Sequence, residues 1–230
     1  MSLTKASGQM YPWISHMHSH LGGVCPHKCS YCYAQDIENR WHSGRYAGEL
    51  RLIESELSVK YGKGKTIFIE HMNDILADGV TQQMVKRIID HCLQWPDNTY
   101  VFQSKNPIRF NDFVWPENSI FGTTIETNIE DPYKKQSQAP WRVDRAKAMK
   151  GLPFKRKFVT IEPVMNFDVE ILARWIGEIN PEFLNLGADS KGHGLPEPSV
   201  EKIMQFAEEL KKYGVELREK HNLQRLKQKG

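Results

Sequence analysis

Short runs of apolar and β-branched residues alternate along this chain with longer segments in which apolar residues recur every three or four positions. The short runs predict β-strands, and the longer amphipathic segments predict α-helices. The expected strands cover residues 13–18, 66–71, 99–104, 119–126, 158–162, 183–187 and 215–218. The expected helices cover residues 81–94, 142–150, 169–179 and 199–213, and residues 34–61 are expected to hold a first helix and further packing.

A strand followed by a helix, repeated along a chain, is typical of a parallel sheet. We therefore expect an α/β protein in which six or seven β-α units form a partial, incomplete TIM-type barrel. The chain has 230 residues, 40% of them hydrophobic, which is enough for one substantial core and too short for two large domains. Because no internal repeat or linker interrupts the pattern, residues 1–230 are expected to form a single domain with a short basic C-terminal tail.

The composition of the chain argues against a membrane protein and against a secreted one. No apolar stretch is long enough to cross a bilayer, and the N-terminus lacks the basic and then apolar plan of a secretory signal. We expect a soluble cytoplasmic protein that contacts no membrane. The formal net charge of +3 does not by itself indicate nucleic acid, although the basic residues between 218 and 229 could contact phosphates.

The strongest chemical signal is a cluster of cysteines in the glycine-rich run 22–33, namely Cys25, Cys29 and Cys32. A structural zinc site normally takes four ligands, and the fourth would have to be a nearby histidine or a distant cysteine: His18, His20, His27 or Cys92. A disulfide framework is not expected in a reducing compartment. Three thiolates instead suit an iron-sulfur cluster in which one iron has no protein ligand.

This C-x3-C-x-aromatic-C spacing resembles the signature of the radical SAM superfamily. The resemblance implies that the three thiolates hold a 4Fe-4S cluster, whose open iron binds S-adenosylmethionine. It also implies that an electron from the cluster cleaves this cofactor to methionine and a 5'-deoxyadenosyl radical, which abstracts hydrogen from a substrate. A low-potential electron donor of the flavodoxin or ferredoxin type is the implied partner.

Further blocks resemble, in the same order, those of a phage-associated radical SAM group that is related to spore photoproduct lyase. They cover residues 67–74, 102–107, 118–127 and 158–163, with a less regular block at 184–189. Many radical SAM proteins have a glycine-glycine-glutamate segment after the second strand, which holds the amino group of the cofactor. This chain has Glu70-His71-Met72-Asn73-Asp74 there. Because the group has no settled function, the resemblance implies the chemistry more than the substrate.

The active site of a parallel barrel lies at the C-terminal ends of its strands. We expect polar residues at these ends, together with aromatic residues of the cysteine loop, to bind the cofactor: Tyr31, Tyr33, Glu70, Asn73, Asp74, Lys105, Thr124, Glu126, Glu162 and Asn185. His71 and Glu162 are also expected to be catalytic. A buried Glu162 would need a cation such as Lys105 or Lys220 beside it.

Two classes of function follow. The first is a radical SAM enzyme that acts on a nucleobase or nucleotide, in DNA modification or repair, with a peptide or small metabolite as the competing substrate class. The second is a non-catalytic module in which a metal stabilises a nucleic-acid-binding fold. The long β-α series favours the enzyme, because a metal-binding knuckle does not need a barrel around it.

Overall fold

The computed structural model describes residues 3–8, 10–131 and 136–228, and its centre is an eight-stranded sheet with the order β1-β2-β5-β6-β7-β8-β9-β10. The short β1 at one edge is antiparallel to β2, and every other neighbouring pair in this sheet is parallel. The strand bounds are β1 (Thr4–Lys5), β2 (His16–His18), β5 (Thr66–Ile69), β6 (Thr99–Gln103), β7 (Ser119–Thr124), β8 (Lys157–Ile161), β9 (Phe183–Leu186) and β10 (Glu216–Glu219). The expected α/β class with a mainly parallel sheet is therefore confirmed.

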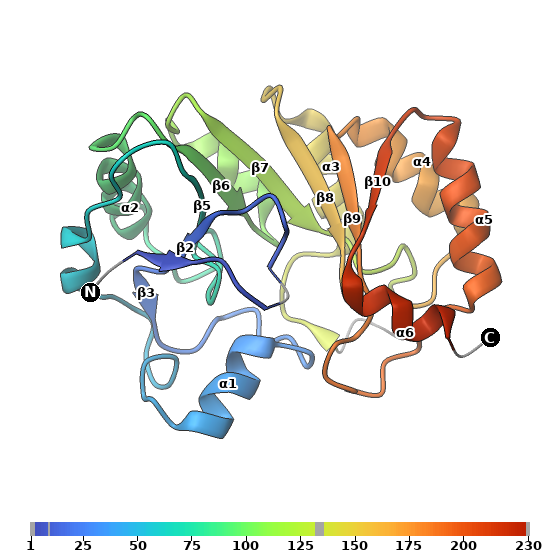
Figure 1. Ribbon diagram of the computed structural model, residues 1–230, viewed down its shortest axis with the longest axis horizontal. Helices are drawn as coiled ribbons and strands as arrows, with labels where there is room; N and C mark the ends of the chain where they lie inside the picture. The colour runs from blue at the N-terminus through green and yellow to red at the C-terminus, as the bar shows by residue number, and fades with distance from the viewer. Residues whose placement is uncertain (1–2, 9, 132–135, 229–230) are drawn as a thin grey trace.

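Helices connect most of the successive strands and lie on the outside of the curved sheet (Figure 1). They are α2 (Gln82–Leu93), α3 (Arg142–Gly151), α4 (Val169–Ile179) and α5 (Val200–Lys211). A 3-10 helix, η2 (Pro107–Asp112), stands between β6 and β7 instead. The side chains of Thr81, Asp168 and Ser199 each accept a hydrogen bond from a backbone N–H of the first helical turn, which fixes where α2, α4 and α5 begin.

The two faces of the sheet bury different sets of residues, because successive side chains of a strand point to opposite faces. In β5, Ile67 and Ile69 belong to the large core that includes the outer helices, whereas Phe68 belongs to a second, smaller cluster. That cluster also contains Phe158 of β8 and Phe183 of β9. Its remaining space is filled by the segment before β2, whose Tyr11 and Trp13 rings stack at a centroid distance of 5.6 Å. The N-terminal segment thus packs into the face of the sheet that the helices leave open.

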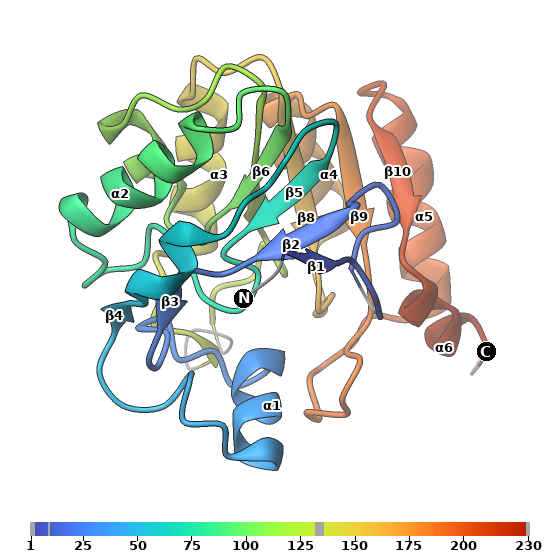
Figure 2. The ribbon, with the colours of Figure 1, turned by 60° about the vertical axis from the view of Figure 1, so that its left-hand side comes forward.

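A smaller unit is inserted between β2 and β5 in the chain, and its helix α1 lies apart from the outer helices (Figures 1 and 2). It consists of a two-stranded sheet, β3 (Leu21–Gly22) with β4 (Arg51–Leu52), together with α1 (Tyr33–Trp41) and the 3-10 helix η1 (Glu54–Ser58). The cysteine run connects β3 to α1 and therefore belongs to this unit.

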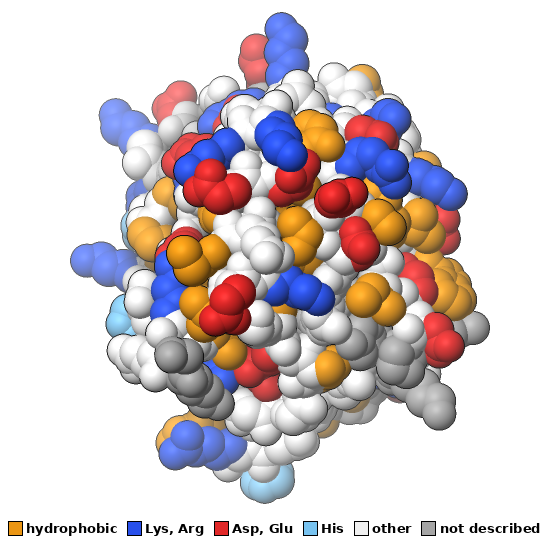
Figure 3. Space-filling view, turned by 90° about the vertical axis from the view of Figure 1, so that its right-hand side faces the viewer, with side chains coloured by type: hydrophobic (Ala, Val, Ile, Leu, Met, Phe, Trp, Pro, Cys, Tyr) orange, Lys and Arg blue, Asp and Glu red, His pale blue; other side chains and the backbone are white. Residues whose placement is uncertain are grey.

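The structure describes the C-terminal region, which was expected to be a short basic tail, up to residue 228. Its described part folds into η4 (His221–Leu223) and α6 (Gln224–Lys227), and Leu223 and Leu226 are buried. Acidic residues pair with its cations, as in Lys220 with Glu162 and Lys227 with Glu219. On the side of the molecule that carries α4 and α5, charges of both signs are interspersed (Figure 3). Carboxylates of the chain therefore hold Lys220 and Lys227. The described chain also contains no helix with the length and apolar character needed to cross a bilayer.

We expect Gly122→Ala to lower the free energy of unfolding by about 1–3 kcal/mol, the usual cost of overpacking a core. A Cβ atom at position 122 would stand 2.2 Å from Cζ of Phe158, whose ring is held by Trp13 and Phe183 and cannot retreat. Urea denaturation followed by circular dichroism measures the change. Gly151→Ala in α3 is the matched control, because its Cβ meets nothing within 4 Å. An equal loss of stability in both variants would contradict this account of the packing.

Candidate functional site

A cavity of about 580 Å³ opens at the C-terminal ends of the parallel strands. Its wall comes from the residues that follow β5, β6, β7, β8, β9 and β10, from the cysteine run and from the N-terminal segment. Most of the residues predicted for the site line it: Cys25, Cys29, Tyr31, Cys32, Tyr33, Glu70, His71, Asn73, Asp74, Lys105, Thr124 and Glu162. Glu126 and Asn185 are buried and do not line the cavity.

The three cysteines of the run share this cavity, and all are free thiols of intermediate exposure. Burial raises the pKa of Cys25 to about 12 and also raises the pKa of Cys32, so these thiols are protonated at neutral pH unless a metal displaces the proton. Cys92, in contrast, is fully buried in α2 and belongs to the hydrophobic core. The motif cysteines are thus separated from the fourth cysteine of the chain.

The backbone of the cysteine run is fitted closely to its surroundings. Gly23 has a φ of +87°, and a Cβ at this position would stand 2.1 Å from the carbonyl oxygen of Glu49. Only glycine satisfies both constraints. The conformation of the run therefore depends on the segment before β4, and no sequence pattern connects the two.

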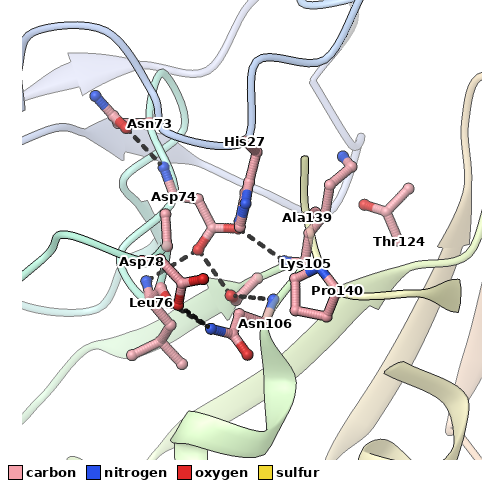
Figure 4. Close-up of polar contacts among 12 residues, drawn as sticks. His27, Asn73, Asp74, Leu76, Asp78, Lys105, Asn106, Thr124, Ala139 and Pro140 are labelled. Atoms are coloured by element: carbon pink, nitrogen blue, oxygen red, sulfur yellow. Dashed lines mark hydrogen bonds and ion pairs between the residues drawn. The ribbon is translucent and has the colours of Figure 1, made fainter. Parts of the chain in front are cut away.

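The segment after β5 holds the cysteine run through two side chains (Figure 4). The Asn73 amide donates a hydrogen bond to the carbonyl oxygen of Gly23 over 3.1 Å. The Asp74 carboxylate lies 2.9 Å from Nε2 of His27, between the first two cysteines. Burial alone would raise the pKa of Asp74, but His27 and the hydrogen bonds from Ser104 and the Lys105 backbone lower it to about 2. Asn73 and Asp74, which were both expected to bind the cofactor, thus bond to groups of the cysteine run.

Glu70 and His71 also face protein partners. Glu70 has a φ of +60°, and its carboxylate accepts hydrogen bonds from the backbone N–H groups of His20 and Leu21. Burial raises the pKa of Glu70 to about 7, although these two hydrogen bonds oppose the rise. His71 lies 3.0 Å from the hydroxyl of Ser19, and burial lowers its pKa to about 4. His71 is therefore neutral at pH 7, and its ring can donate one hydrogen bond and accept another.

Behind the cavity wall, the carboxylate of Glu126, two residues after β7, pairs with cations from α3 and from the loop after β6. Arg145 and Arg142 of α3 lie 3.0 Å and 3.1 Å from its carboxylate, and Nζ of Lys105 lies 3.6 Å away. Burial opposes ionisation, but these cations keep the pKa of Glu126 well below its ordinary value. The hydroxyl of Tyr31, between two motif cysteines, donates a hydrogen bond to the same carboxylate. Glu126 therefore acts on the cavity through Tyr31 and Lys105.

The Lys105 ammonium is one of the cations that line the cavity, together with Lys191 and Lys220. It makes no hydrogen bond to any residue the structure describes, and its closest carboxylate is that of Glu126. Burial would lower the pKa of Lys105, but Cys29 and Glu126 raise it. Lys105 thus offers three N–H donors on a permanent charge, which is the arrangement expected of an anion-binding group.

A row of neutral polar side chains forms another part of the wall. The Tyr11 hydroxyl donates to Oε1 of Gln103 over 2.9 Å and lies 2.7 Å from the Thr160 hydroxyl, and the Gln103 amide donates to Thr124 over 2.9 Å. Asn185 contacts Thr160 from behind at 3.4 Å. Sequence reasoning missed both residues: Tyr11 lies outside every recognised block, and Gln103 ends β6 within the block 102–107 but was passed over in favour of Lys105.

Glu162 closes this wall beside β10. Its carboxylate accepts hydrogen bonds from Lys220 over 2.6 Å and from Asn222 over 2.8 Å. Lys220, rather than Lys105, is therefore the cation that neutralises Glu162, and the same ammonium lies 4.7 Å from the centre of the Tyr11 ring.

The loop after β9 crosses to α1 beside the cavity, as Figure 2 shows for the orange loop below the sheet. In this loop, Nδ1 of His193 lies 2.6 Å from Asp189, and Nε2 lies 3.1 Å from Asp36 of α1. A histidine that faces a carboxylate with each ring nitrogen satisfies both only as the imidazolium ion. Burial would lower the pKa of His193, but the two aspartates raise it.

Comparison with known proteins identifies both a family and a fold. A family model described as "Protein of unknown function (DUF5131)" matches residues 14–177. No curated protein matches the sequence. A cysteine-to-serine mutant of spore photoproduct lyase superposes with a TM-score of 0.59 at 12% identity, over 93% of this chain and 79% of that chain.

A second spore photoproduct lyase structure, a double mutant with bound AdoMet and dinucleoside spore photoproduct, superposes with a TM-score of 0.55 at 14% identity. The match covers 89% of this chain and 63% of that one, so this chain spans less than two thirds of that protein. At such identities the likeness shows the fold alone, so this chain shares the α/β fold of these two structures.

We expect trypsin to cleave after Lys191 faster at about pH 8 than at about pH 6, because the ion pairs of His193 are complete at the lower pH and weaken as the pH rises. The pKa of His193 is raised above 6.5, so its contribution to loop stability is complete below 6.5 and is lost as the pH rises through the folded-state pKa. Mass spectrometry of the digest measures the rate relative to cleavage after the exposed Lys63, which corrects for the pH response of trypsin.

In the His193→Asn variant, trypsin should cleave after Lys191 fast at both pH values, because asparagine cannot carry the positive charge that pairs with the two aspartates. If the wild-type ratio does not change with pH, or if the variant keeps the wild-type profile, the pairing of His193 with Asp36 does not hold this loop.

Proposed function

The chain belongs to the DUF5131 family of proteins of unknown function, and we propose that it is a radical SAM enzyme. One observation carries the proposal: the three cysteines of a C-x3-C-x2-C motif line a single cavity at the C-terminal ends of a parallel sheet. In parallel α/β proteins this end of the sheet is where active sites are built. The fold shared with spore photoproduct lyase supports the same assignment.

The donor set fits a 4Fe-4S cluster held by Cys25, Cys29 and Cys32. In the described part of the chain, no three His, Cys, Asp or Glu side chains stand close enough together for a single metal ion. A four-iron cluster is larger than one ion, so its thiolate ligands stand farther apart. What favours the cluster over the zinc module is the fold around the thiols, because a metal-binding knuckle needs no eight-stranded sheet around it.

When bound, the cluster and S-adenosylmethionine supply one-electron cleavage of the cofactor, which yields the hydrogen-abstracting 5'-deoxyadenosyl radical. The protein contributes the binding groups. The Lys105 ammonium, without a hydrogen-bond partner among the described residues, would take the carboxylate of the cofactor. Tyr31 is held by Glu126 and shields the cysteine run, and the neutral wall of Gln103, Thr124 and Thr160 lines the cavity with donors and acceptors.

A nucleobase or nucleotide is the substrate class we propose. Support comes from the fold relative that holds a dinucleoside and from the exposed Lys191 at the cavity, for which no side-chain partner is found in the described chain. Aromatic walls at Tyr11, Tyr33 and Phe68 would pack against a base. A peptide or small metabolite is the competing substrate class. It gains weight because Lys220, Arg225 and Lys227 are paired with glutamates, so they do not supply the phosphate contacts that a nucleic acid would need.

We further propose that the curved sheet is an incomplete barrel of the radical SAM type, that the chain is one domain, and that a low-potential flavodoxin or ferredoxin reduces the cluster. A closer relation to the phage-associated group remains part of the proposal. The order and direction of the strands support the proposal of an incomplete barrel.

Anaerobic reconstitution should give a brown protein with one 4Fe-4S cluster, which is lost in Cys25→Ala, Cys29→Ala or Cys32→Ala, because each removes one of three ligands. Iron and sulfide analysis with visible absorbance measures loading. Cys92→Ala is the matched control and should load fully, since Cys92 lies in the core. A colourless zinc-loaded wild type, or full loading in Cys29→Ala, would overturn the proposal.

Reduced, loaded protein should convert S-adenosylmethionine slowly to 5'-deoxyadenosine, and a nucleotide or short oligonucleotide should accelerate this conversion. The reason is that substrate binding orders the reacting groups in the cavity. Chromatography of reactions with nucleotides, oligonucleotides, peptides and small metabolites compares the classes. Acceleration by a peptide or metabolite alone would overturn the nucleotide assignment and leave the radical chemistry standing.

A further inference from the structure

Asp74 was predicted to bind the cofactor, yet its carboxylate has no acceptor capacity left. Oδ1 accepts from the backbone N–H of Leu76 over 2.9 Å and from the Ser104 hydroxyl over 2.7 Å. Oδ2 accepts from the backbone N–H of Lys105 over 2.7 Å and lies 2.9 Å from Nε2 of His27. A carboxylate has about four lone-pair sites, and here all are used.

Three of these four partners belong to the scaffold, and the fourth belongs to the cysteine run. Leu76 follows β5, and Ser104 and Lys105 follow β6, so they fix the carboxylate relative to the sheet. His27 lies between Cys25 and Cys29 and is 4% exposed, which leaves its ring no freedom to turn away. Figure 4 shows His27 and the residues after β5 and β6 converging on Asp74.

The backbone of His27 is held on its other side as well. Its carbonyl oxygen accepts from the backbone N–H of Gln138 over 2.7 Å and from the Ser137 hydroxyl over 3.3 Å. The Ser137 hydroxyl also lies 3.2 Å from Sγ of Cys29. The turn between the first two cysteines is therefore held at the His27 ring by Asp74 and at the His27 carbonyl group by Ser137 and Gln138.

We propose that Asp74 is a positioning residue that holds the cysteine run in its cluster-binding conformation through the His27 ring. The inference rests on the proposed function, because it concerns a cluster held by Cys25, Cys29 and Cys32. A histidine fixed by a carboxylate is also the arrangement found when the histidine itself is a metal ligand. The experiment below separates the two roles.

The test compares the reconstituted wild type with Asp74→Asn, His27→Gln and His27→Ala. Iron release to a chelator under anaerobic conditions, the EPR spectrum of the reduced cluster and the thermal midpoint of the cluster-free protein are measured for each. Asp74→Asn and His27→Ala should release iron about 10- to 100-fold faster, the usual effect of losing a partner that orients a ligand. His27→Gln keeps an N–H donor near the same position and should release iron at close to the wild-type rate.

Asp78→Asn is the matched control, because Asp78 lies in the same loop, is exposed and accepts only from Asn106 in the described chain. It should leave iron release and the EPR spectrum unchanged. The double variant Asp74→Asn with His27→Ala should release iron no faster than either single variant, since both remove one interaction.

The outcomes distinguish the inference from the function on which it rests. If the wild type binds no cluster, the proposed function fails. If the wild type binds a cluster and Asp74→Asn holds it equally well, only the positioning role fails. If His27→Gln behaves like His27→Ala, or if the double variant shows additive effects, Asp74 does not act through the His27 donor. Should Asp74→Asn not fold, the comparison of His27→Gln with His27→Ala still decides, because both leave the scaffold bonds of Asp74 intact.

Discussion

The buried charge of Glu126 is the constraint on which the arrangement of this cavity depends. An ionised carboxylate with no solvent contact costs several kcal/mol unless cations and hydrogen bonds replace the lost water. Arg142 and Arg145 come from α3, Lys105 from the loop after β6, and the Tyr31 hydroxyl from the cysteine run. Neutralising one side chain thus brings a helix, a strand end and the cysteine run to a common point.

Charge neutralisation inside the wall also determines which groups are left for a ligand. Glu70, Asp74, Glu126 and Glu162 all have protein partners, so the carboxylates near this cavity are already occupied. The groups that remain are the ammonium groups of Lys105 and Lys191, the thiols of the cysteine run and neutral amides and hydroxyls. Such a wall is suited to the anionic groups of a ligand, such as a carboxylate or a phosphate.

The amino-acid sequence was sufficient to predict the alternation of strands and helices and the gathering of the cysteines with strand-end residues, because both follow from local periodicity and from parallel topology. It was not sufficient to predict what the strand-end side chains contact. Asp74 and Glu126 follow strands, as cofactor ligands would, but each binds protein groups that lie far away in the chain, His27 in one case and Arg145 in the other. Tyr11 was missed because its role depends on Gln103 and Thr160, which no pattern near residue 11 indicates.

The N-terminal segment that fills the open face of the sheet has a consequence for how the chain folds during synthesis. Tyr11 and Trp13 leave the ribosome early, yet they pack against Phe158 of β8, Trp13 also packs against Phe183 of β9, and the Tyr11 hydroxyl contacts Thr160, 149 positions later. Contacts of such separation form slowly, since a long loop must close before they stabilise anything. Until residues 158–183 are made, these aromatic side chains have no complete site, so they are synthesised well before their partners and are among the last to reach their final place.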